Sequence, residues 1–389
     1  MVTNIDFVFF DAGGGHRSAA TALKSVIEQG DAQQNRPWNI RLVNLQEILD
    51  ELDVFRKVTG IRLEDLYNQA LARGWTLGSA YGIGLIHAVI RLNHKSMVRL
   101  MRRHWENTRP AMVVSLVPNF NRVLHESLIA ALPLAPFTTI LTDFADFPPH
   151  FWMERPPAPN SAGAPTKPQY LICGTPKAVE QARALGHDPQ HVSLVSGMIL
   201  RPKFYDPLMV DRKAERVRLG LDPDRPTGLV LFGGQGSGVM LEIARRLPNT
   251  QLIFICGRNQ KLADALRALP ASAPRLVEGF TSEIPYYMHL SDFFIGKPGP
   301  GSISEAVAMR LPVIIERNAW TLAQERYNVE WVREHEAGIV LSNFRGIAAA
   351  VESLLANLQH YRANVAKIDN RAVFEIPDIV AKILDSRPR

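Results

Sequence analysis

The sequence predicts an α/β protein made of two domains, each built on a doubly wound parallel sheet. The chain has 389 residues, which is more than one compact core usually holds. In both halves, short apolar runs alternate with helical patterns, as they do in parallel sheets with crossover helices. A glycine-rich turn follows an apolar run near the start of each half, at residues 13–15 and 233–238. A strand that turns through glycines into a helix collects backbone N–H groups and the positive end of a helix dipole.

The first domain is expected to span residues 1–205, with prolines near its end forming a linker. Its helix after the first strand is expected at residues 16–29, and the Pro- and Gly-rich residues 156–168 are expected to form a loop. Apolar runs of strand length predict the strands of its sheet at 4–10, 39–44, 112–117, 138–141 and 170–173.

The second domain is expected to span residues 206–374 and to repeat the same alternation. A last helix at about residues 375–389 is expected to pack back on the first domain. The strands of the second sheet are predicted at 228–232, 251–256, 275–278, 292–295, 312–316 and 338–341.

Composition narrows the class of protein and its compartment. The net charge of +6 favours an anionic partner, such as a phosphate ester, an acidic lipid surface or nucleic acid. The two cysteines, Cys173 and Cys256, lie in apolar runs, so we expect buried thiols in a reducing compartment. The first apolar run contains Asp6 and reads as a buried strand rather than a signal peptide. No apolar stretch reaches the ~18 residues that span a bilayer.

Residues 75–104 depart from the alternation of strands and helices. Residues 75–90 are apolar, and residues 91–104 are strongly basic. An apolar stretch followed by a basic helix favours binding at an anionic membrane surface. A helix buried on its own domain with one solvated basic face explains the pattern too. The cations are Arg91, Lys95, Arg99, Arg102 and Arg103, with His94 and His104 beside them.

The first glycine turn, Gly13-Gly14-Gly15, lacks the spacing of a dinucleotide fingerprint and the lysine of a phosphate loop. By itself it is equally well explained as a tight connection between a strand and a helix. His16 opens the following helix, where the helix dipole is expected to lower its pKa and keep the imidazole neutral. A neutral imidazole of this kind is a candidate general base, and an ordinary polar cap is the alternative.

The second half carries two further polar motifs. The turn from Lys297 leads through glycines into a helix, where its N–H groups suit a diphosphate and the carboxylate of Glu305 suits a ribose diol. Farther along, Gln324, Glu325 and Asn328 are expected on one helix face, where amide and carboxylate groups can bind sugar hydroxyls. A polar surface helix is the competing explanation for these three residues.

These motifs together resemble one family, the monogalactosyldiacylglycerol synthases and processive diacylglycerol glucosyltransferases. The wider group includes the lipid-linked peptidoglycan GlcNAc transferase. The similarity covers nearly the whole chain with its blocks in the expected order. In the first half the blocks are Gly13-Gly14-Gly15-His16-Arg17-Ser18-Ala19-Ala20, Leu141-Thr142-Asp143, Gly197 and Arg201-Pro202-Lys203-Phe204. In the second half they are Phe232-Gly233-Gly234, Ile255-Cys256-Gly257-Arg258-Asn259, Glu278-Gly279-Phe280, Lys297-Pro298-Gly299-Pro300-Gly301-Ser302-Ile303-Ser304-Glu305-Ala306 and Gln324-Glu325-Arg326-Tyr327-Asn328.

The resemblance implies a GT-B fold, in which two Rossmann-like domains face each other across a cleft that holds the active site. It implies a UDP-sugar donor, UDP-Gal or UDP-Glc, held by the second domain. Phosphate contacts would come from Gly234, Gln235, Gly236 and Ser237 near Arg258, and from Gly299, Pro300, Gly301 and Ser302. Uracil would lie against the backbone of Phe280 and Thr281, the ribose at Glu305, and the sugar at Gln324, Glu325 and Asn328.

The chemistry that the resemblance implies is inverting transfer of a hexose to a lipid acceptor such as diacylglycerol. The acceptor would lie at Gly13, Gly14, Gly15 and His16. The base would be His16, with Asp143 as the alternate. Helix N-termini would stabilise the departing UDP, so no metal and no other cofactor is expected. The enzyme would lie in the cytoplasm, peripherally on the inner face of the cell membrane, through residues 75–104, and would not bind nucleic acid.

The acceptor half departs from the family pattern at two places. Val117-Pro118 stands where plant members carry His-Pro, and the segment from Asp143 to Trp152 is altered from the family's His-Pro-x-Trp pattern. The donor is therefore better supported than the acceptor, and an acceptor other than diacylglycerol stays open. Two alternatives also stay open: a UDP-sugar epimerase of the non-hydrolysing type, and a catalytically silent nucleotide-sugar-binding or membrane-scaffold protein.

Overall fold

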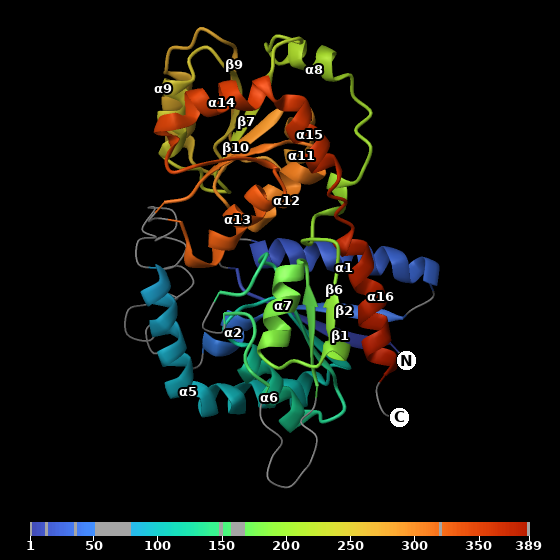
Figure 1. Cartoon of the computed structure of the whole chain (residues 1–389). Helices are drawn as coiled ribbons and strands as arrows, with labels where there is room; N and C mark the ends of the chain where they lie inside the picture. The colour runs from blue at the N-terminus through green and yellow to red at the C-terminus, as the bar shows by residue number, and fades with distance from the viewer. Residues whose placement is uncertain are drawn as a thin grey trace. The chain divides into compact units, whose positions relative to one another are not determined.

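The computed structural model describes residues 2–11, 15–34, 37–50, 79–147, 151–156, 168–318 and 321–386. The chain divides into two compact units (Figure 1). Unit 1 contains the described residues up to Arg201, together with those from Arg371 onward. Unit 2 contains Pro202–Asn370. The chain therefore leaves unit 1, builds unit 2, and returns to unit 1 for its last helix.

Unit 1 is built on a six-stranded parallel sheet in the order β2-β1-β3-β4-β5-β6. Helix α1 (Gly15–Gln34) connects the first two strands, and α16 (Ala372–Asp385) packs against α1. Isoleucine and phenylalanine side chains such as Ile5 and Phe7 are fully buried, as expected for strands covered on both faces. The strands are β1 (Thr3–Phe9), β2 (Trp38–Asn44), β3 (Met112–Ser115), β4 (Phe137–Ile140), β5 (Gln169–Cys173) and β6 (Val192–Leu194).

Helix α5 (Ser79–Thr108) is a long amphipathic helix of unit 1 that packs against α6 (Asn121–Ala131). Its buried residues Met97, Met101 and Trp105 recur every four residues, so they form one apolar stripe. The indole Nε1 of Trp105 donates a hydrogen bond of 3.0 Å to the hydroxyl of Ser127 on α6. The basic residues of α5 therefore lie on the faces that this stripe leaves in solvent.

Unit 2 repeats the architecture with a second six-stranded parallel sheet, in the order β12-β11-β10-β7-β8-β9. One apolar cluster joins one face of this sheet to α9 (Val239–Arg246), α10 (Gln260–Arg267) and α14 (Ile347–Ala356). Helices α12 (Pro300–Ala308) and α13 (Arg326–Glu334) lie along β10, β11 and β12. The strands are β7 (Thr227–Leu231), β8 (Gln251–Ile255), β9 (Arg275–Glu278), β10 (Phe293–Gly296), β11 (Val313–Glu316) and β12 (Gly338–Leu341).

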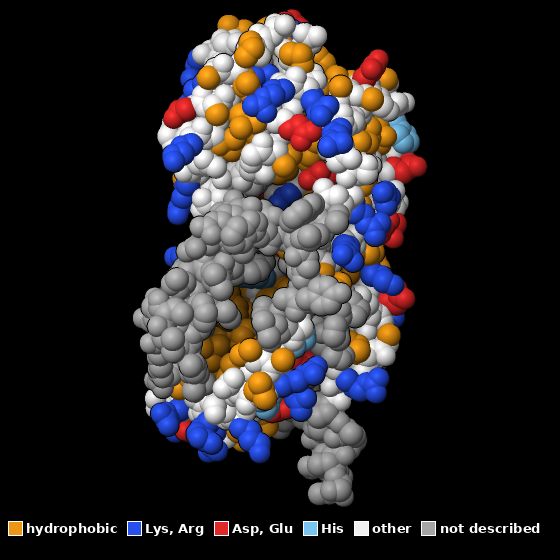
Figure 2. Space-filling view, turned by 90° about the vertical axis from the view of Figure 1, so that its left-hand side faces the viewer, with side chains coloured by type: hydrophobic (Ala, Val, Ile, Leu, Met, Phe, Trp, Pro, Cys, Tyr) orange, Lys and Arg blue, Asp and Glu red, His pale blue; other side chains and the backbone are white. Residues whose placement is uncertain are grey.

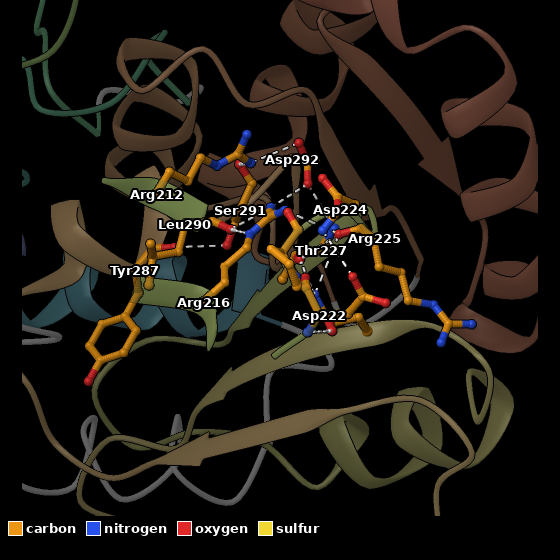
Figure 3. A network of polar contacts seen from close by, with 12 residues as sticks. Arg212, Arg216, Asp222, Asp224, Arg225, Thr227, Tyr287, Leu290, Ser291 and Asp292 are labelled. Carbon is orange, nitrogen blue, oxygen red and sulfur yellow. Dashed lines mark hydrogen bonds and ion pairs between the residues drawn. The ribbon is translucent and has the colours of Figure 1, made fainter. Parts of the chain in front are cut away.

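A network of ion pairs around Asp292 fastens the starts of β7 and β10 together (Figure 3). The N–H of Thr227 donates to Asp292 Oδ2 at 2.9 Å, and the N–H of Asp292 donates back to the Thr227 carbonyl at 2.7 Å. Burial favours a raised pKa for Asp292, but the pairs with Arg212 and Arg216 and the Thr227 N–H outweigh it and lower the pKa. Three guanidinium groups contact this carboxylate at 2.6 to 2.8 Å, from Arg212, Arg216 and Arg362.

In each unit the strand order reverses direction at one point along the sheet. In unit 1 the chain builds β1 and β2 outward on one side, then β3 to β6 on the other. In unit 2 it builds β7, β8 and β9 on one side, then β10, β11 and β12 on the other. Connections leave in opposite directions at such a point, and ligands of open α/β sheets generally bind outside the carboxyl ends of the two strands.

The predicted fold class is confirmed, and the predicted strands are all present, with no strand end shifted by more than two residues. The sequence prediction missed β6, which has only three residues and no fully buried side chain. Cys173 and Cys256 are free and buried, and burial raises the pKa of their thiols to about 12 and about 11. Most of the predicted loop at residues 156–168 lies outside the described residues.

Replacing Asp292 by Asn should destabilise unit 2 by about 3–5 kcal/mol, because it leaves several arginines without their buried partner. Hydrogen exchange of the β7 and β10 peptides measures the free energy of opening of this unit. Asp264→Asn is the matched control, since its pair with Arg267 at 3.1 Å is solvent-exposed and should contribute at most about 1 kcal/mol. Equal protection in Asp292→Asn and the wild type would show that the network does not fasten the sheet.

Candidate active site

A glycine turn follows β7 at the switch point of the sheet in unit 2. Gly233 and Gly236 have φ values of +73° and +61°, which side-chain-bearing residues rarely adopt. A Cβ on Gly236 would lie 2.7 Å from Leu262 Cδ2 and 2.9 Å from the Cys256 carbonyl oxygen. In contrast, a Cβ on Gly234 meets no atom within 4 Å, so its outer side is open to a ligand. The turn is thus tightly packed at Gly236 and has an accessible backbone at Gly234.

The loop after β8 supports this turn from beside it. Gly257 has a φ of +58°, and a Cβ there would lie 2.1 Å from the Gly234 carbonyl oxygen. The N–H of Arg258 donates to that same oxygen at 2.9 Å, and Asn259 Nδ2 donates to the Gln235 carbonyl at 3.3 Å. The loops that follow neighbouring strands are therefore tied to each other by backbone contacts.

Arg258 also contacts the loop after β9. Its guanidinium carbon lies 5.1 Å from the centre of the Phe280 ring, within the range of a cation–π contact. The Phe280 side chain is 66% exposed, which is unusual for so large an apolar group. Next to it, the Thr281 hydroxyl accepts a hydrogen bond of 3.0 Å from the Glu283 N–H. An exposed ring on a hydrogen-bonded turn is suited to stack on a flat ligand.

The N-terminus of α12 directly follows β10, the strand beside β7 at the switch point. Gly299 caps the helix without any side-chain hydrogen bond, and Pro300 follows at the first helical position. A helix leaves its first N–H groups without partners inside the helix, so those of Gly301 and Ser302 are available to an anion. A Cβ on Gly301 meets nothing within 4 Å. Glu305 lies one turn into this helix and is partly buried.

Glu325 and Asn328 pack against the same turn. Lys297 Nζ forms an ion pair with Glu325 Oε1 at a distance of 3.3 Å. A Cβ on Gly299 would lie 3.7 Å from the same oxygen. Asn328 Nδ2 donates to the Pro298 carbonyl at 2.8 Å. The side-chain oxygens of Gln324 and Asn328 are buried and have no hydrogen-bond partner among the described residues. Two buried acceptors beside a turn open to ligand point to a hydroxylated molecule.

The local structure here differs from the single helix face that the sequence pattern predicts. Gln324 and Glu325 lie in a short 3-10 turn, Ala323–Glu325, and α13 begins only at Arg326. The tighter 3-10 turn rotates these two side chains relative to Asn328. All three still come from one continuous segment next to the turn after β10.

In unit 1, His16 is the candidate base, and it opens α1 at the end of β1. Its Nδ1 lies 3.1 Å from the Thr142 hydroxyl, and its ring centre lies 5.8 Å from that of Trp152. Burial lowers the pKa of His16 to about 4, against the smaller opposing effect of a hydrogen bond with the Leu116 backbone. The main cause of the low pKa is therefore burial and not the helix dipole that the sequence pattern suggested. Of the glycines before it, Gly15 is described, whereas Gly13 and Gly14 lie outside the described residues.

Asp143, the alternate base, is hydrogen-bonded to the Trp152 indole. The indole Nε1 donates to Asp143 Oδ2 at 2.8 Å, and the Trp152 N–H donates to Asp146 Oδ1 at 2.6 Å. Asp143 is 7% exposed, so its remaining contacts lie inside the protein. Trp152 thereby joins both candidate bases into one wall.

Sequence reasoning missed two residues near this wall, His87 and Asn119. Asn119 follows β3 with a φ of +67°, a conformation that is uncommon for any residue with a side chain. His87 on α5 fixes it through a contact of 2.6 Å between Nε2 and Asn119 Oδ1. The Pro118-Asn119 pair is the sequence feature that could have indicated this turn, because Asn tolerates left-handed backbone in turns. The contact links α5 to the carboxyl end of β3.

A third missed residue is Glu316, at the carboxyl end of β11 in unit 2. Burial raises the pKa of Glu316 to about 7, and the nearby carboxylate of Glu242 adds to the effect. Glu242 lies in the first turn of α9, directly after the glycine turn of β7. Only the tertiary fold brings these two acids together, since they are far apart in the sequence.

The described residues hold no group of three His, Cys, Asp or Glu side chains arranged for a metal ion. They do provide a set of backbone donors, an exposed ring and buried acceptors in unit 2, and a neutral imidazole in unit 1. The first set fits a nucleoside diphosphate joined to a polyol. The imidazole fits removal of a proton from a hydroxyl group.

Comparison with known proteins gives the relatives of the chain. A probable monogalactosyldiacylglycerol synthase 2 from Oryza sativa subsp. indica is 27% identical over 98% of this chain and 80% of the rice protein. The monogalactosyldiacylglycerol synthase of Spinacia oleracea is 28% identical over 96% of this chain and 70% of the spinach protein. No protein-family model matches the chain.

Solved structures share the fold across both units. MurG of Acinetobacter baumannii superposes with a TM-score of 0.60 at 13% identity, covering 98% of this chain and 100% of MurG. Anabaena HepE in complex with UDP-glucose gives a TM-score of 0.52 at 14% identity, covering 98% of this chain and 99% of HepE. At these identities the likeness establishes the fold alone.

The chain is a glycosyltransferase with the GT-B fold of two Rossmann-like units, as the motifs and the fold predicted. Its relatives over nearly the full chain are the monogalactosyldiacylglycerol synthases, so the family resemblance of the motifs is confirmed. The predicted enzyme class, a hexosyltransferase, is confirmed by these relatives.

Substitution of Gly236 by Ala should destabilise unit 2 by roughly 1–3 kcal/mol, because the new Cβ meets Leu262 and the Cys256 carbonyl at a positive φ. Gly238→Ala is the matched control, since its Cβ meets nothing within 4 Å and its φ is −58°. The control should change the free energy of unfolding by about 0.5 kcal/mol or less. A Gly236→Ala protein as stable as the control, by urea titration, would contradict the described turn.

Proposed function

We propose that the enzyme transfers a hexose from UDP-Gal or UDP-Glc to the hydroxyl group of a lipid such as diacylglycerol. One observation carries the donor half of this proposal. The two anion-type turns of unit 2, at residues 233–238 and 299–302, follow β7 and β10 and therefore flank the switch point of the sheet. A diphosphate is the ligand that two such turns suit together.

The remaining donor groups extend outward from this diphosphate position. Uracil would stack near the exposed Phe280 ring, beside the Thr281 backbone, and Glu305 would accept hydrogen bonds from the ribose hydroxyls. The buried oxygens of Gln324 and Asn328, with the Glu325 carboxylate, would accept hydrogen bonds from the sugar hydroxyls. UDP-glucose bound to Anabaena HepE, which shares the fold, supports this class of donor.

The proposed reaction is a single displacement with inversion at the anomeric carbon. The acceptor oxygen forms a bond to the anomeric carbon, while the bond from that carbon to the β-phosphate oxygen breaks and UDP leaves with the electron pair. His16 takes the proton of the acceptor hydroxyl, since its low pKa keeps the imidazole neutral. The N–H groups of α12 stabilise the charge that develops on the departing diphosphate. Asp143 is the alternate base.

A lipid acceptor is supported by the relatives, whose names specify monogalactosyldiacylglycerol as their product. It is supported also by α5, whose exposed residues Arg91, Lys95 and Arg99 recur every four residues and form a basic stripe. Leu92 beside this stripe is 86% exposed. Figure 2 shows this side of the molecule, with Lys and Arg side chains gathered at its lower rim near apolar side chains.

No helix among the described residues is long and apolar enough to cross a membrane. We propose peripheral binding to the inner face of the cell membrane.

Lipid-dependent release of UDP tests the whole proposal. UDP-Glc, UDP-Gal and UDP-GlcNAc are each incubated with a total lipid extract or purified diacylglycerol, and products are identified by mass spectrometry. We expect a glycolipid and UDP, with Glu305→Gln raising KM for the donor about tenfold or more through loss of a charged hydrogen bond. Glu352→Gln, an exposed position on α14, is the matched control. Epimerised UDP-sugar formed without acceptor would refute transfer.

The pH dependence of kcat/KM tests His16 as the base. Because the pKa is lowered to about 4, the imidazole stays unprotonated as the pH falls from about 8 to about 5, and the rate should stay level. The rate should fall only as the pH approaches about 4. His16→Asn and His16→Ala should both lower kcat by about 10²–10⁴. Enzyme returned to neutral pH before assay controls for unfolding, and an acid limb near the ordinary value of 6.5 would contradict the assignment.

Removal of the α5 charges tests membrane binding. The triple variant Arg91→Gln/Lys95→Gln/Arg99→Gln should bind vesicles of phosphatidylcholine with phosphatidylglycerol more weakly, by about 1 kcal/mol per charge. The triple variant Arg245→Gln/Lys261→Gln/Arg345→Gln removes the same charge from exposed positions of unit 2 and is the control. Sedimentation that is equal for both variants, or indifferent to anionic lipid, would reject α5 as the membrane contact.

A further inference from the structure

A basic hollow lies in unit 2 beyond the carboxyl ends of β11 and β12. Its volume is about 400 Å³, which is ample for a phosphate group and its water shell. Half of the residues that line it are arginines. The lining consists of Arg317, Asn318, Arg326, Arg333, Leu341 and Ser342.

Rigid elements hold these side chains in place. Arg317 directly follows β11, and its N–H donates to the Leu341 carbonyl at the end of β12 at 2.8 Å. Arg326 and Arg333 are seven residues apart on α13, so they lie two turns apart on one face of the helix. Arg326 is the first residue of α13 and so adds its charge to the positive end of the helix dipole.

The charges in the hollow are not balanced by the protein. Glu330 pairs with Arg317 at 2.8 Å and with Arg333 at 3.1 Å, so one carboxylate serves two guanidinium groups. Arg326 has no ion pair among the described residues. These groups leave about two uncompensated positive charges at one place. The Arg317 and Arg333 side chains are 45% and 49% exposed, so their N–H groups remain accessible to a ligand.

The hollow is separate from the two turns proposed for the UDP-sugar. Those turns follow β7 and β10, whereas the hollow lies at β11 and β12, at the outer edge of the sheet. Neighbouring strands lie about 4.8 Å apart, so β12 is about 10 Å from β10. A diphosphate that bridges β7 and β10 does not fill this hollow.

We infer that the hollow binds the phosphate group of a second ligand, which goes beyond the proposed transfer reaction. Planar guanidinium groups bind phosphate oxygens through paired N–H donors, and the Ser342 hydroxyl supplies a further donor. The group can come from the headgroup of an anionic lipid or from a free phosphate compound. Both present the same oxygens to the arginines.

Inorganic phosphate is the first probe, titrated calorimetrically into the full chain with UDP absent. The double variant Arg326→Gln/Arg333→Gln should bind it at least about tenfold more weakly, because it lacks two of the charged hydrogen-bond donors. Arg245→Gln/Arg345→Gln, from exposed positions of unit 2, is the control with the same loss of charge. Phosphate bound at the two donor turns persists in both variants and is displaced by UDP.

Vesicles distinguish the two sources of the phosphate group. If the source is a lipid, the double variant should also lose affinity for vesicles of phosphatidylcholine with phosphatidylglycerol relative to its control. If the source is soluble, only the phosphate titration should change. Equal binding of inorganic phosphate by the wild type and the double variant would overturn the inference, whatever the outcome of the hexosyl transfer assay.

Discussion

The site in unit 2 depends on the fixed alignment of β7 with β10. Asp292 provides this alignment, because its backbone and its carboxylate bond to Thr227 at the start of the neighbouring strand. Arginines from α8 (Arg212–Arg218) and α15 (Leu358–Ala366) converge on the same carboxylate. Fastening the strands at their amino ends sets the spacing of their carboxyl ends, where both glycine turns begin. Burying the Asp292 carboxylate costs free energy by itself. Its ion pairs and backbone bonds thus position the backbone N–H donors at the carboxyl edge of the sheet.

Unit 1 also has an ion pair that joins neighbouring strands of its sheet. Asp6 on β1 pairs with Arg41 directly opposite on β2, and Arg41 also donates to the Thr108 carbonyl at the end of α5. The carboxyl edge of this sheet then presents an imidazole and an indole in place of a second anion turn. The carboxyl edge of the sheet in unit 2 thus carries glycine turns with backbone N–H groups, and that of unit 1 carries a buried imidazole.

The roles predicted for the donor residues stay predictions, whereas the sequence sufficed for the fold class and for most strand positions, because apolar runs and glycine turns are local signals. It did not suffice for the short β6, or for the 3-10 turn that carries Gln324 and Glu325, since both depend on tertiary contacts. His87 with Asn119, Glu316 with Glu242, and the three arginines around one hollow come together only in the fold. The low pKa of His16 was predictable, but its cause, burial beside Trp152 and Thr142, was not.

A crystal structure of the complex with UDP would show where the donor binds. The diphosphate should lie between the turns at residues 233–238 and 299–302, with uracil beside Phe280 and the ribose at Glu305. The side-chain oxygens of Gln324 and Asn328 should face the open end where the sugar attaches. A diphosphate seated instead among Arg317, Arg326 and Arg333, or against His16 in unit 1, would contradict the assignment of the donor to the switch point of unit 2.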